Sequence, residues 1–399
     1  MSKRFEGEII IWIEAIKKIM AIFLGPFLTA YFIKVSLESM VDLSLYYIFS
    51  YMLLGLTTFV IAGFTNNRFK IGMFRIGVIL NFIYIMSIII LKEDIVKNIG
   101  LISVLHGIST ATYYFPYNLF LSNKIDNKDR TEHTVKTKTL ISIINVIFPI
   151  ILGSIITATN FLLTAYIILF LSIIHIILSF MIKNNMNYEY KEFSLIHSWK
   201  RLRKNKQVKK MLAVEYFIGM NINGALGTLM TVLIFNSFKT DMNLGIINSI
   251  TALFTVIAIK FYGKKYKGHD DKNIVLLSGV TPLISLLILL LLKSNITVII
   301  YNLCYSVFTN IILLTRDIRL YNVTNSNMVG KEDRTEFLSI REFVLNLGRV
   351  TSYGLLLIAG IFNNELVLNI SLILLTLSIL VTGYFIRKIS KFEYIKNDS

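Results

Sequence analysis

Apolar runs long enough to cross a membrane alternate with short polar segments along almost the whole chain. A helix needs about 20 residues to cross roughly 30 Å of hydrocarbon. Counted this way, the pattern predicts six membrane helices in each half of the chain. They span 9–33, 43–64, 71–91, 99–122, 138–158, 161–182, 211–235, 244–263, 273–292, 298–320, 341–362 and 366–386.

The connections between these runs divide the chain. Only Thr159 and Asn160 separate the fifth and sixth runs, which predicts an antiparallel helical hairpin. The longest polar connection lies between the halves, and its apolar positions, Trp199, Leu202 and Val208, predict a short basic amphipathic helix at the membrane surface. The predicted units are a six-helix bundle at 1–183, a cytoplasmic linker at 184–210, and a second bundle with a short tail at 211–399.

The second half repeats landmarks of the first at a nearly constant offset. The tetrapeptide Asp-Arg-Thr-Glu occurs twice, each time in a segment that we predict to be a polar loop. Duplicated halves are typical of secondary transporters. The matching pairs are 129–132 with 333–336, Glu14 with Glu215, and Gly63 with Gly263, at separations of 204, 201 and 200 positions.

Composition and charge agree with a membrane protein. Charged residues make up 16% of the chain, against about 25% in soluble domains. Loops and helix ends on one side carry 33 of the 41 lysines and arginines, and the opposite side carries 5. The positive-inside rule therefore predicts that both termini are cytoplasmic, in the inner membrane of a bacterium. The net charge of +17 needs no nucleic acid to explain it, because basic loops are expected beside an anionic leaflet.

Signatures of enzymes and cofactor sites are absent from the sequence. It has no P-loop, no dinucleotide-binding glycine motif after a strand, and no HExxH zinc motif. The five histidines are scattered and Cys304 is the single cysteine, so we predict no metal site. We expect neither an enzyme nor a cofactor, and uphill transport would need an ion gradient.

Twelve predicted spans in two related halves resemble the major facilitator superfamily. That family carries, after its second helix, a glycine followed by an acidic residue, an arginine, a glycine and a basic residue. Gly63, Arg68 and Lys70 match this pattern, whereas Asn67 replaces the acidic residue and Phe69 the second glycine. The resemblance implies that this loop braces the cytoplasmic side of the two bundles, with a brace that lacks its usual charge.

Leu24–Phe27, the pair Tyr46-Tyr47 and Arg341–Phe343 resemble, more narrowly, the YqgE-like branch of bacterial transporters, which implies no particular substrate. The wider family implies two bundles that rock about a central cavity lined by helices one, four, five, seven, ten and eleven. The residues that we expect to take part in conformational gating are Gly63, Asn67, Arg68, Lys70, Asp129, Arg130, Asp333 and Arg334.

Ionisable residues inside the predicted spans are candidates for function, because burying charge in a bilayer is costly. Glu14 has Lys17 and Lys18 on its own helix face. It either forms an interfacial pair with them or takes up a proton or a cationic substrate. Glu215, its counterpart in helix seven, is followed at four-residue steps by Gly219, Asn223 and Gly227, which give that helix a small and polar side.

Helices ten and eleven carry further charges. Arg316 and Asp317 end the apolar part of helix ten, and Arg349 lies at a comparable depth in helix eleven. We predict that Asp317 bridges to Arg349 or Arg316. The bridge would bind substrate, close the cytoplasmic gate, or fix helix packing.

Helix four presents a stripe of His106, Thr110, Tyr113 and Tyr117, with Tyr114 and Asn118 beside it. Aromatic rings with polar tips suit a cavity for amphipathic molecules, although a packed aromatic face has the same pattern. Helix five adds Asn145, and His175 in helix six is interpreted as a hydrogen-bonded core residue.

We therefore predict a secondary transporter that works by alternating access. The preferred hypothesis is proton-coupled efflux of a small amphipathic or cationic compound by a monomer in the lipid bilayer, with Glu14 or Asp317 as the titrating group. One alternative is an importer of an anionic metabolite, bound by Lys18, Arg316 and Arg349. Another is a membrane sensor or assembly partner that does not transport and uses 183–210 as its contact surface.

Overall fold

The computed structural model describes residues 3–37, 39–65, 70–124, 127–182, 193–265, 272–325, 329–330 and 333–389. All regular elements within these ranges are helices. The first half holds α1 (Lys3–Ile22), the π-helical turn η1 (Phe23–Phe27), α2 (Leu28–Val35), α3 (Met40–Thr65), α4 (Lys70–Leu91), the 3₁₀ turn η2 (Lys92–Ile95), α5 (Ile99–Lys124), α6 (Asn127–Ala158) and α7 (Phe161–Met181). The second half holds α8 (Leu195–Leu202), α9 (Lys206–Met220), α10 (Ala225–Phe238), α11 (Asp241–Lys265), α12 (Lys272–Leu292), α13 (Asn295–Asn325), α14 (Arg334–Phe362) and α15 (Glu365–Lys388).

Ten helical segments among the described residues are long and apolar enough to span a membrane. The two other predicted spans are the first, which is α1 continued through η1 and α2, and the fourth, which is α5. The first carries the charges of Glu14, Lys17 and Lys18, and α5 is diluted by histidine, serine, threonine and tyrosine. The all-helical membrane fold is confirmed, and the crossing by these two segments stays a prediction.

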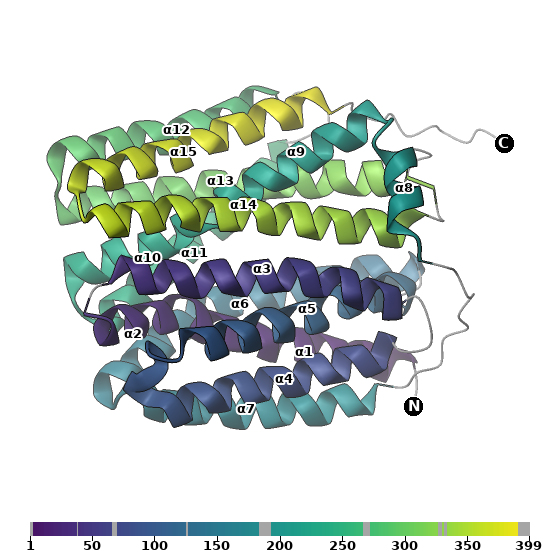
Figure 1. Ribbon diagram of the computed structural model, residues 1–399, viewed down its shortest axis with the longest axis horizontal. Helices are drawn as coiled ribbons and strands as arrows, with labels where there is room; N and C mark the ends of the chain where they lie inside the picture. The colour runs from purple at the N-terminus through teal and green to yellow at the C-terminus, as the bar shows by residue number, and fades with distance from the viewer. Residues whose placement is uncertain are drawn as a thin grey trace.

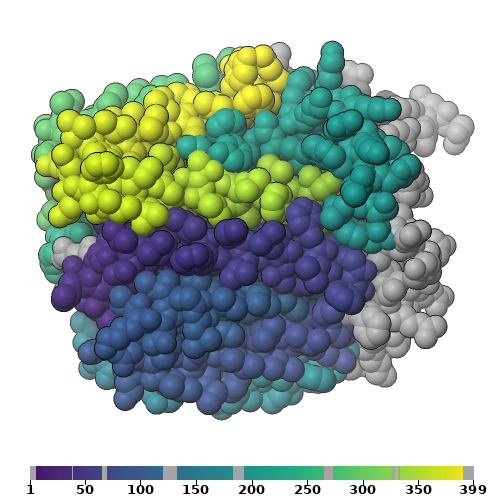
Figure 2. Space-filling view, in the orientation of Figure 1, coloured from purple at the N-terminus to yellow at the C-terminus, as the bar shows by residue number. Residues whose placement is uncertain are grey.

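The helices form two bundles that lie side by side (Figure 1). Helices α1 to α7 occupy one half of the molecule, and α9 to α15 occupy the other. The first turn of α1 and the last turn of α15 lie at the same end, which we call the terminal end. Across the junction α3 packs along α14 and α6 packs along α11, and the first of these contacts runs along the face shown in Figure 2.

Glycines bring α6 and α11 into close backbone contact at the end away from the termini. A Cβ atom on Gly153 would lie 2.5 Å from the carbonyl oxygen of Asp241, and one on Gly245 would lie 2.3 Å from that of Pro149. Small residues at helix crossings allow this approach in membranes, where the hydrophobic effect does not drive helices together. The two bundles are therefore in direct contact at that end.

The fifth and sixth predicted helices form the expected hairpin. Asn160 is the N-cap of α7, and its side-chain oxygen accepts a hydrogen bond from the backbone N–H of Leu163 at 2.8 Å. Such a cap satisfies one of the free N–H groups at the start of a helix.

The seventh predicted helix is not continuous, and this corrects the sequence prediction. It breaks between α9 and α10 at Asn221–Gly224. The side-chain amide of Asn221 donates to the hydroxyls of Ser378 (3.1 Å) and Thr382 (2.9 Å). The backbone N–H of Ala225 donates to the Ser352 hydroxyl. Irregular backbone at membrane depth needs such internal partners. The π-helical turn η1 in the first helix lies at nearly the same duplication offset.

The repeated tetrapeptides do not lie in loops, which is a second correction. Residues 129–132 belong to the first turns of α6, and Asp333 is the N-cap residue of α14, with 334–336 in its first turn. The helices extend beyond the apolar runs because hydropathy marks the membrane core rather than the helix end. Acidic residues are favourable at a helix N-terminus.

The linker contains α8, which packs against the start of α14. Arg201 donates to both carboxylate oxygens of Asp333, at 3.0 and 2.5 Å. The backbone N–H of Ser194 donates to a Glu336 oxygen at 3.3 Å. The second copy of the tetrapeptide thus ties the linker to the second bundle.

Candidate functional site

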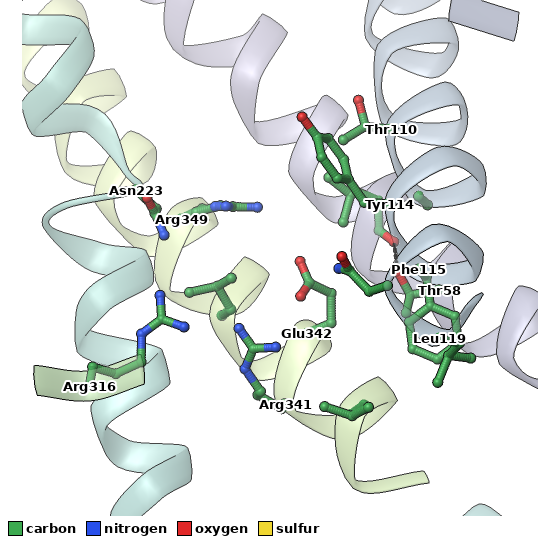
Figure 3. Close-up of a pocket in the computed structure, with 15 residues that line it drawn as sticks. Thr58, Thr110, Tyr114, Phe115, Leu119, Asn223, Arg316, Arg341, Glu342 and Arg349 are labelled. Carbon is green, nitrogen blue, oxygen red and sulfur yellow. Dashed lines mark hydrogen bonds between the residues drawn. The ribbon is translucent and has the colours of Figure 1, made fainter. Parts of the chain in front are cut away.

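A cavity of 360 Å³ lies between the two bundles, in the half nearer the terminal end. Four helices and the α9–α10 break contribute to its wall (Figure 3). The first bundle supplies Leu54 and Thr58 from α3, and Thr110, Ala111, Tyr114, Phe115, Asn118 and Leu119 from α5. The second bundle supplies Asn223 from the break, Arg316 from α13, and Leu338, Arg341, Glu342, Leu345 and Arg349 from α14.

Three arginines dominate the wall formed by the second bundle. Arg341 and Arg349 are two helical turns apart on α14, and Arg316 comes from α13 (Figure 3). Residues at i, i+4 and i+8 share a face of a helix, so Leu345 lies between the two α14 arginines. The sequence prediction included Arg316 and Arg349 and missed Arg341. Arg341 precedes Arg349 by eight residues, which places both on the same face of one helix, and this spacing could have identified Arg341 from the sequence.

Glu215 lies buried behind this wall, with an exposed fraction of 0%. Its Oε1 atom is 3.2 Å from Nε of Arg341 and 3.6 Å from Nη1 of Arg316. Neither contact has hydrogen-bond geometry, because both oxygens of the Glu215 carboxylate lack a hydrogen-bond partner among the described residues. The carboxylate is thus a counter-charge held between two cavity arginines.

The predicted bridge from Asp317 goes to Arg316, at 3.1 Å, and not to Arg349. The Asp317 side chain is 60% exposed and lies outside the cavity wall. Arg349 is held differently. It donates to the side-chain oxygen of Asn346 at 2.8 Å, and its guanidinium lies over the Tyr51 ring, 4.8 Å from the centroid.

Helix α5 presents a different face to the cavity from the predicted one. Thr110, Tyr114 and Asn118 line the cavity. Tyr113 and Tyr117 are 1% and 4% exposed and pack in the interior of the first bundle, with α1 and α4. Of the two interpretations of the predicted stripe, Tyr113 and Tyr117 thus agree with the packed aromatic face, and the residue one position after each, Tyr114 and Asn118, lines the cavity.

Glu14 lies inside the first bundle rather than in the cavity wall. Its Oε1 atom accepts a hydrogen bond of 2.9 Å from the Tyr117 hydroxyl. The Lys17 ammonium lies over the ring of Tyr113 at 4.6 Å and over that of Tyr114 at 5.4 Å. Lys17 itself does not line the cavity. Lys18 is partly buried and does not line the cavity.

The structure places the other predicted residues as follows. Asn223 lines the cavity from the α9–α10 break, whereas Asn145 on α6 does not line it. Gly63 lies near the end of α3, 3.8 Å from Phe193 of the linker when a Cβ is built on it. Lys70 begins α4, and Arg334 begins α14. Asn67 and Arg68 lie outside the described residues, as do the side chains of Asp129 and Arg130.

At the end away from the termini the bundles meet through side chains as well as backbone. The rings of Tyr47 on α3 and Tyr353 on α14 stack with centroids 4.5 Å apart. Lys34 on α2 donates to the Asp241 carboxylate on α11 at 2.6 Å. Cross-bundle contacts thus close the molecule on one side of the cavity.

Groups of three or more potential metal ligands are absent from the described part of the chain. The cavity itself contributes arginine, amide, hydroxyl and carboxylate groups together with aromatic rings. Such a set binds by charge, hydrogen bonds and stacking.

The sequence model of the Major Facilitator Superfamily matches residues 16–353. The chain belongs to this family. The membership confirms the resemblance noted from the sequence, and it identifies a transporter rather than an enzyme. The uncharacterized protein YqgE of Bacillus subtilis (strain 168) is 22% identical over 355 residues, which cover 88% of this chain and 82% of that protein.

Solved transporter structures share the fold. A crystal structure of a point mutant of the nucleoside transporter NupG gives a TM-score of 0.69 at 12% identity, over 97% of this chain and 100% of that one. A bacterial homologue of the iron transporter ferroportin, in an inward-facing state, gives 0.68 at 12% identity, over 97% and 99% of the chains. At such identities the likeness concerns the fold alone.

Proposed function

We propose that this protein carries a small molecule across the cytoplasmic membrane of a bacterium by alternating access. The observation that supports this most directly is the polar cavity lined by both bundles, placed toward one end while cross-bundle contacts close the other. Rocking of the bundles would open the cavity to one side of the membrane at a time. Both termini are proposed to be cytoplasmic, which puts the cavity in the cytoplasmic half.

The proposed units are the bundles 1–183 and 211–399, joined by the linker 184–210. The proposed gating groups are the loop after α3 and the two tetrapeptides. The Arg201–Asp333 ion pair supports a role for the second tetrapeptide, because it joins the linker to the first turn of α14. A linker tied to one bundle moves with that bundle when the two rock.

The proposed substrate is amphipathic and leaves the cell in exchange for protons. Tyr114 and Phe115 offer apolar surface beside the charged groups of the cavity. Glu14 is the proposed proton carrier, because it is a carboxyl group at membrane depth whose described hydrogen-bond partner is the neutral phenol of Tyr117. Asp317 is not retained for this role, since its side chain is largely exposed and already paired with Arg316.

Flux in proteoliposomes tests the proposal. Vesicles loaded with fluorescein, an amphipathic anion, or with ethidium, an amphipathic cation, are followed with and without a pH gradient. We expect at least one dye to leave faster than it leaves protein-free vesicles loaded in the same way. We also expect the pH gradient to accelerate this release. No release of either dye contradicts the proposal and favours the sensor alternative. Uptake of external dye by unloaded vesicles, without release from loaded ones, would favour the importer.

Two matched substitutions separate the proton carrier from an ordinary charge. Glu14→Gln keeps the shape of the side chain and removes its titration, so the gradient should no longer accelerate release. Asp317→Asn makes the same chemical change outside the cavity wall and should leave the acceleration intact. The coupling role of Glu14 is refuted when both variants respond to the gradient like the unmodified protein.

A further inference from the structure

The cavity concentrates cationic side chains on one of its walls. Arg316, Arg341 and Arg349 line it from the second bundle, and Glu342 is the one carboxylate in the lining. Figure 3 shows the guanidinium groups of Arg316 and Arg341 extending toward one another from two different helices. Charged groups at membrane depth are costly and face a cavity or one another. The lining therefore carries an excess of positive charge.

Carboxylates outside the lining offset part of this charge, but they approach the arginines from the sides away from the cavity. Glu215 approaches Arg316 and Arg341 from the buried side, and Asp317 approaches Arg316 from the exposed side. Neither lines the cavity. Both fix the arginine side chains from behind and leave the cavity side open.

The arginines also have unused hydrogen-bonding capacity. The protein contacts occupy only part of this capacity: Arg341 Nε lies 3.2 Å from Glu215 Oε1, and Arg349 Nη1 donates to Asn346. A guanidinium carries five N–H donors in a planar fork that matches carboxylate and phosphate oxygens. Because all three side chains line the cavity, their remaining N–H groups can donate to an oxyanion bound there.

The opposite wall has a different chemistry. Tyr114, Phe115, Leu54 and Leu119 come from the first bundle and give it an aromatic and aliphatic surface. A molecule with one anionic group and an apolar body would contact both bundles at once. The cavity volume of 360 Å³ is within the range of small-molecule sites, about 300–1,000 Å³.

We infer that the substrate of this transporter is an organic anion, whose charged group binds among Arg316, Arg341 and Arg349 while its apolar part packs against Tyr114 and Phe115. This assignment rests on the transport function proposed above. Of the amphipathic or cationic compound favoured from the sequence it keeps the amphipathic character, and it takes the anionic charge from the alternative hypothesis. Glu215 acts as the internal counter-charge that holds Arg316 and Arg341 in the empty cavity.

Collisional quenching measures the charge preference of the cavity without a known substrate. Trp12 and Trp199, the two native tryptophans, are replaced by phenylalanine, and Tyr114→Trp places one reporter in the wall. Quenching of the purified full chain in a neutral detergent is compared for iodide, caesium and neutral acrylamide. We expect iodide to quench at least about fivefold better than caesium, because the arginines lie nearer the cavity space than Glu215 and Asp317 and one unit of excess positive charge suffices in a medium of intermediate dielectric constant.

Charge substitutions must move this ratio in opposite directions. Arg341→Gln removes a cavity charge and should lower the ratio of iodide to caesium quenching by at least about half. Glu215→Gln removes the counter-charge and should raise it. Should Glu215→Gln fail to fold, Glu342→Gln carries the same prediction from the lining itself. Arg387→Gln, on the exposed end of α15, is the matched control and should leave the ratio unchanged.

The outcomes separate this inference from the proposed function. Equal quenching by iodide and caesium, or a ratio that Arg341→Gln leaves unchanged, overturns the assignment of an anionic substrate. Failure of acrylamide to reach Trp at position 114 instead contradicts the cavity on which the proposed transport rests. In the flux assay the same assignment requires release of fluorescein and not of ethidium. Release of ethidium alone would refute the anion and leave transport itself supported.

Discussion

Substitution of Gly348 by alanine tests whether the helix crossing beside the cavity depends on the absence of a side chain. A Cβ on Gly348 would lie 2.0 Å from the carbonyl oxygen of Tyr216, and one on Gly219 would lie 2.0 Å from that of Leu345. The two glycines thus face one another across the α9–α14 crossing. Ordinary van der Waals contact begins at 3.4 Å, so α9 and α14 would have to separate by about 1.4 Å to admit one methyl group.

The expected loss of stability can be estimated by comparing two glycines of α14. Gly354 lies six residues after Gly348 in the same helix, and a Cβ built on it meets nothing within 4 Å. Alanine is favoured over glycine in a helix interior by about 0.5–1 kcal/mol, and this gain applies to both positions. The difference between Gly348→Ala and Gly354→Ala therefore isolates the cost of overpacking, about 1–3 kcal/mol.

Thermal unfolding in detergent measures this difference. Both variants are heated at the same scan rate and followed by tyrosine and tryptophan fluorescence, since unfolding of such proteins is often irreversible. Gly348→Ala should melt below the unmodified protein, and Gly354→Ala at or above it. The double variant Gly219→Ala/Gly348→Ala should lower the melting temperature by less than the sum of the two single decreases, because one separation of the helices relieves both clashes.

Two results would contradict a crossing that depends on the two glycines. If Gly348→Ala melts with or above Gly354→Ala, the close crossing is not required for stability. Additive losses in the Gly219 and Gly348 double variant would show that the two sites are not relieved by a common movement.

Two further predictions concern the contact between bundles and the break in the seventh helix. Lys34→Gln removes the 2.6 Å ion pair with Asp241 and should favour opening at that end, seen as a longer distance between spin labels on the adjoining ends of α3 and α14. Lys97→Gln, whose 2.7 Å carboxylate partner lies in its own bundle, should not change that distance. Asn221→Ala removes two donor bonds to α15 hydroxyls and should cost about 1–3 kcal/mol in thermal unfolding. Asn295→Ala, at an exposed position, should be nearly neutral, and equal losses would contradict a special role for Asn221.

Helix positions followed from the sequence because the membrane imposes a length and a composition on each span. The break at Asn221–Gly224 was not predicted, because Gly219, Asn223 and Gly227 were interpreted as one small and polar side of a continuous helix. Ser352 accepts from the backbone N–H of Ala225, and Ser378 and Thr382 accept from the Asn221 side-chain amide. All three are more than a hundred positions away in the sequence. Such partners are visible only once the chain has folded.

The aromatic stripe of α5 shows a second limit. Helical periodicity fixes which residues share a face, and it does not fix how that face is turned in the bundle. Tyr113 and Tyr117 share a face, as predicted, but that face packs against α1 and α4. The neighbouring face, with Tyr114 and Asn118, lines the cavity. One residue position corresponds to a rotation of about 100°, which is enough to exchange core and cavity.

The paired carboxylates show how a duplicated position can acquire two chemistries. The sequence offset pairs Glu14 with Glu215, yet Glu14 accepts a hydrogen bond from the phenol of Tyr117 and Glu215 contacts two arginines. The second bundle therefore holds the cationic wall of the cavity, and the first holds the aromatic wall. A substrate that needs both walls binds best when the bundles are close. In the mechanism proposed here its binding energy then favours an occluded state, from which either side can open.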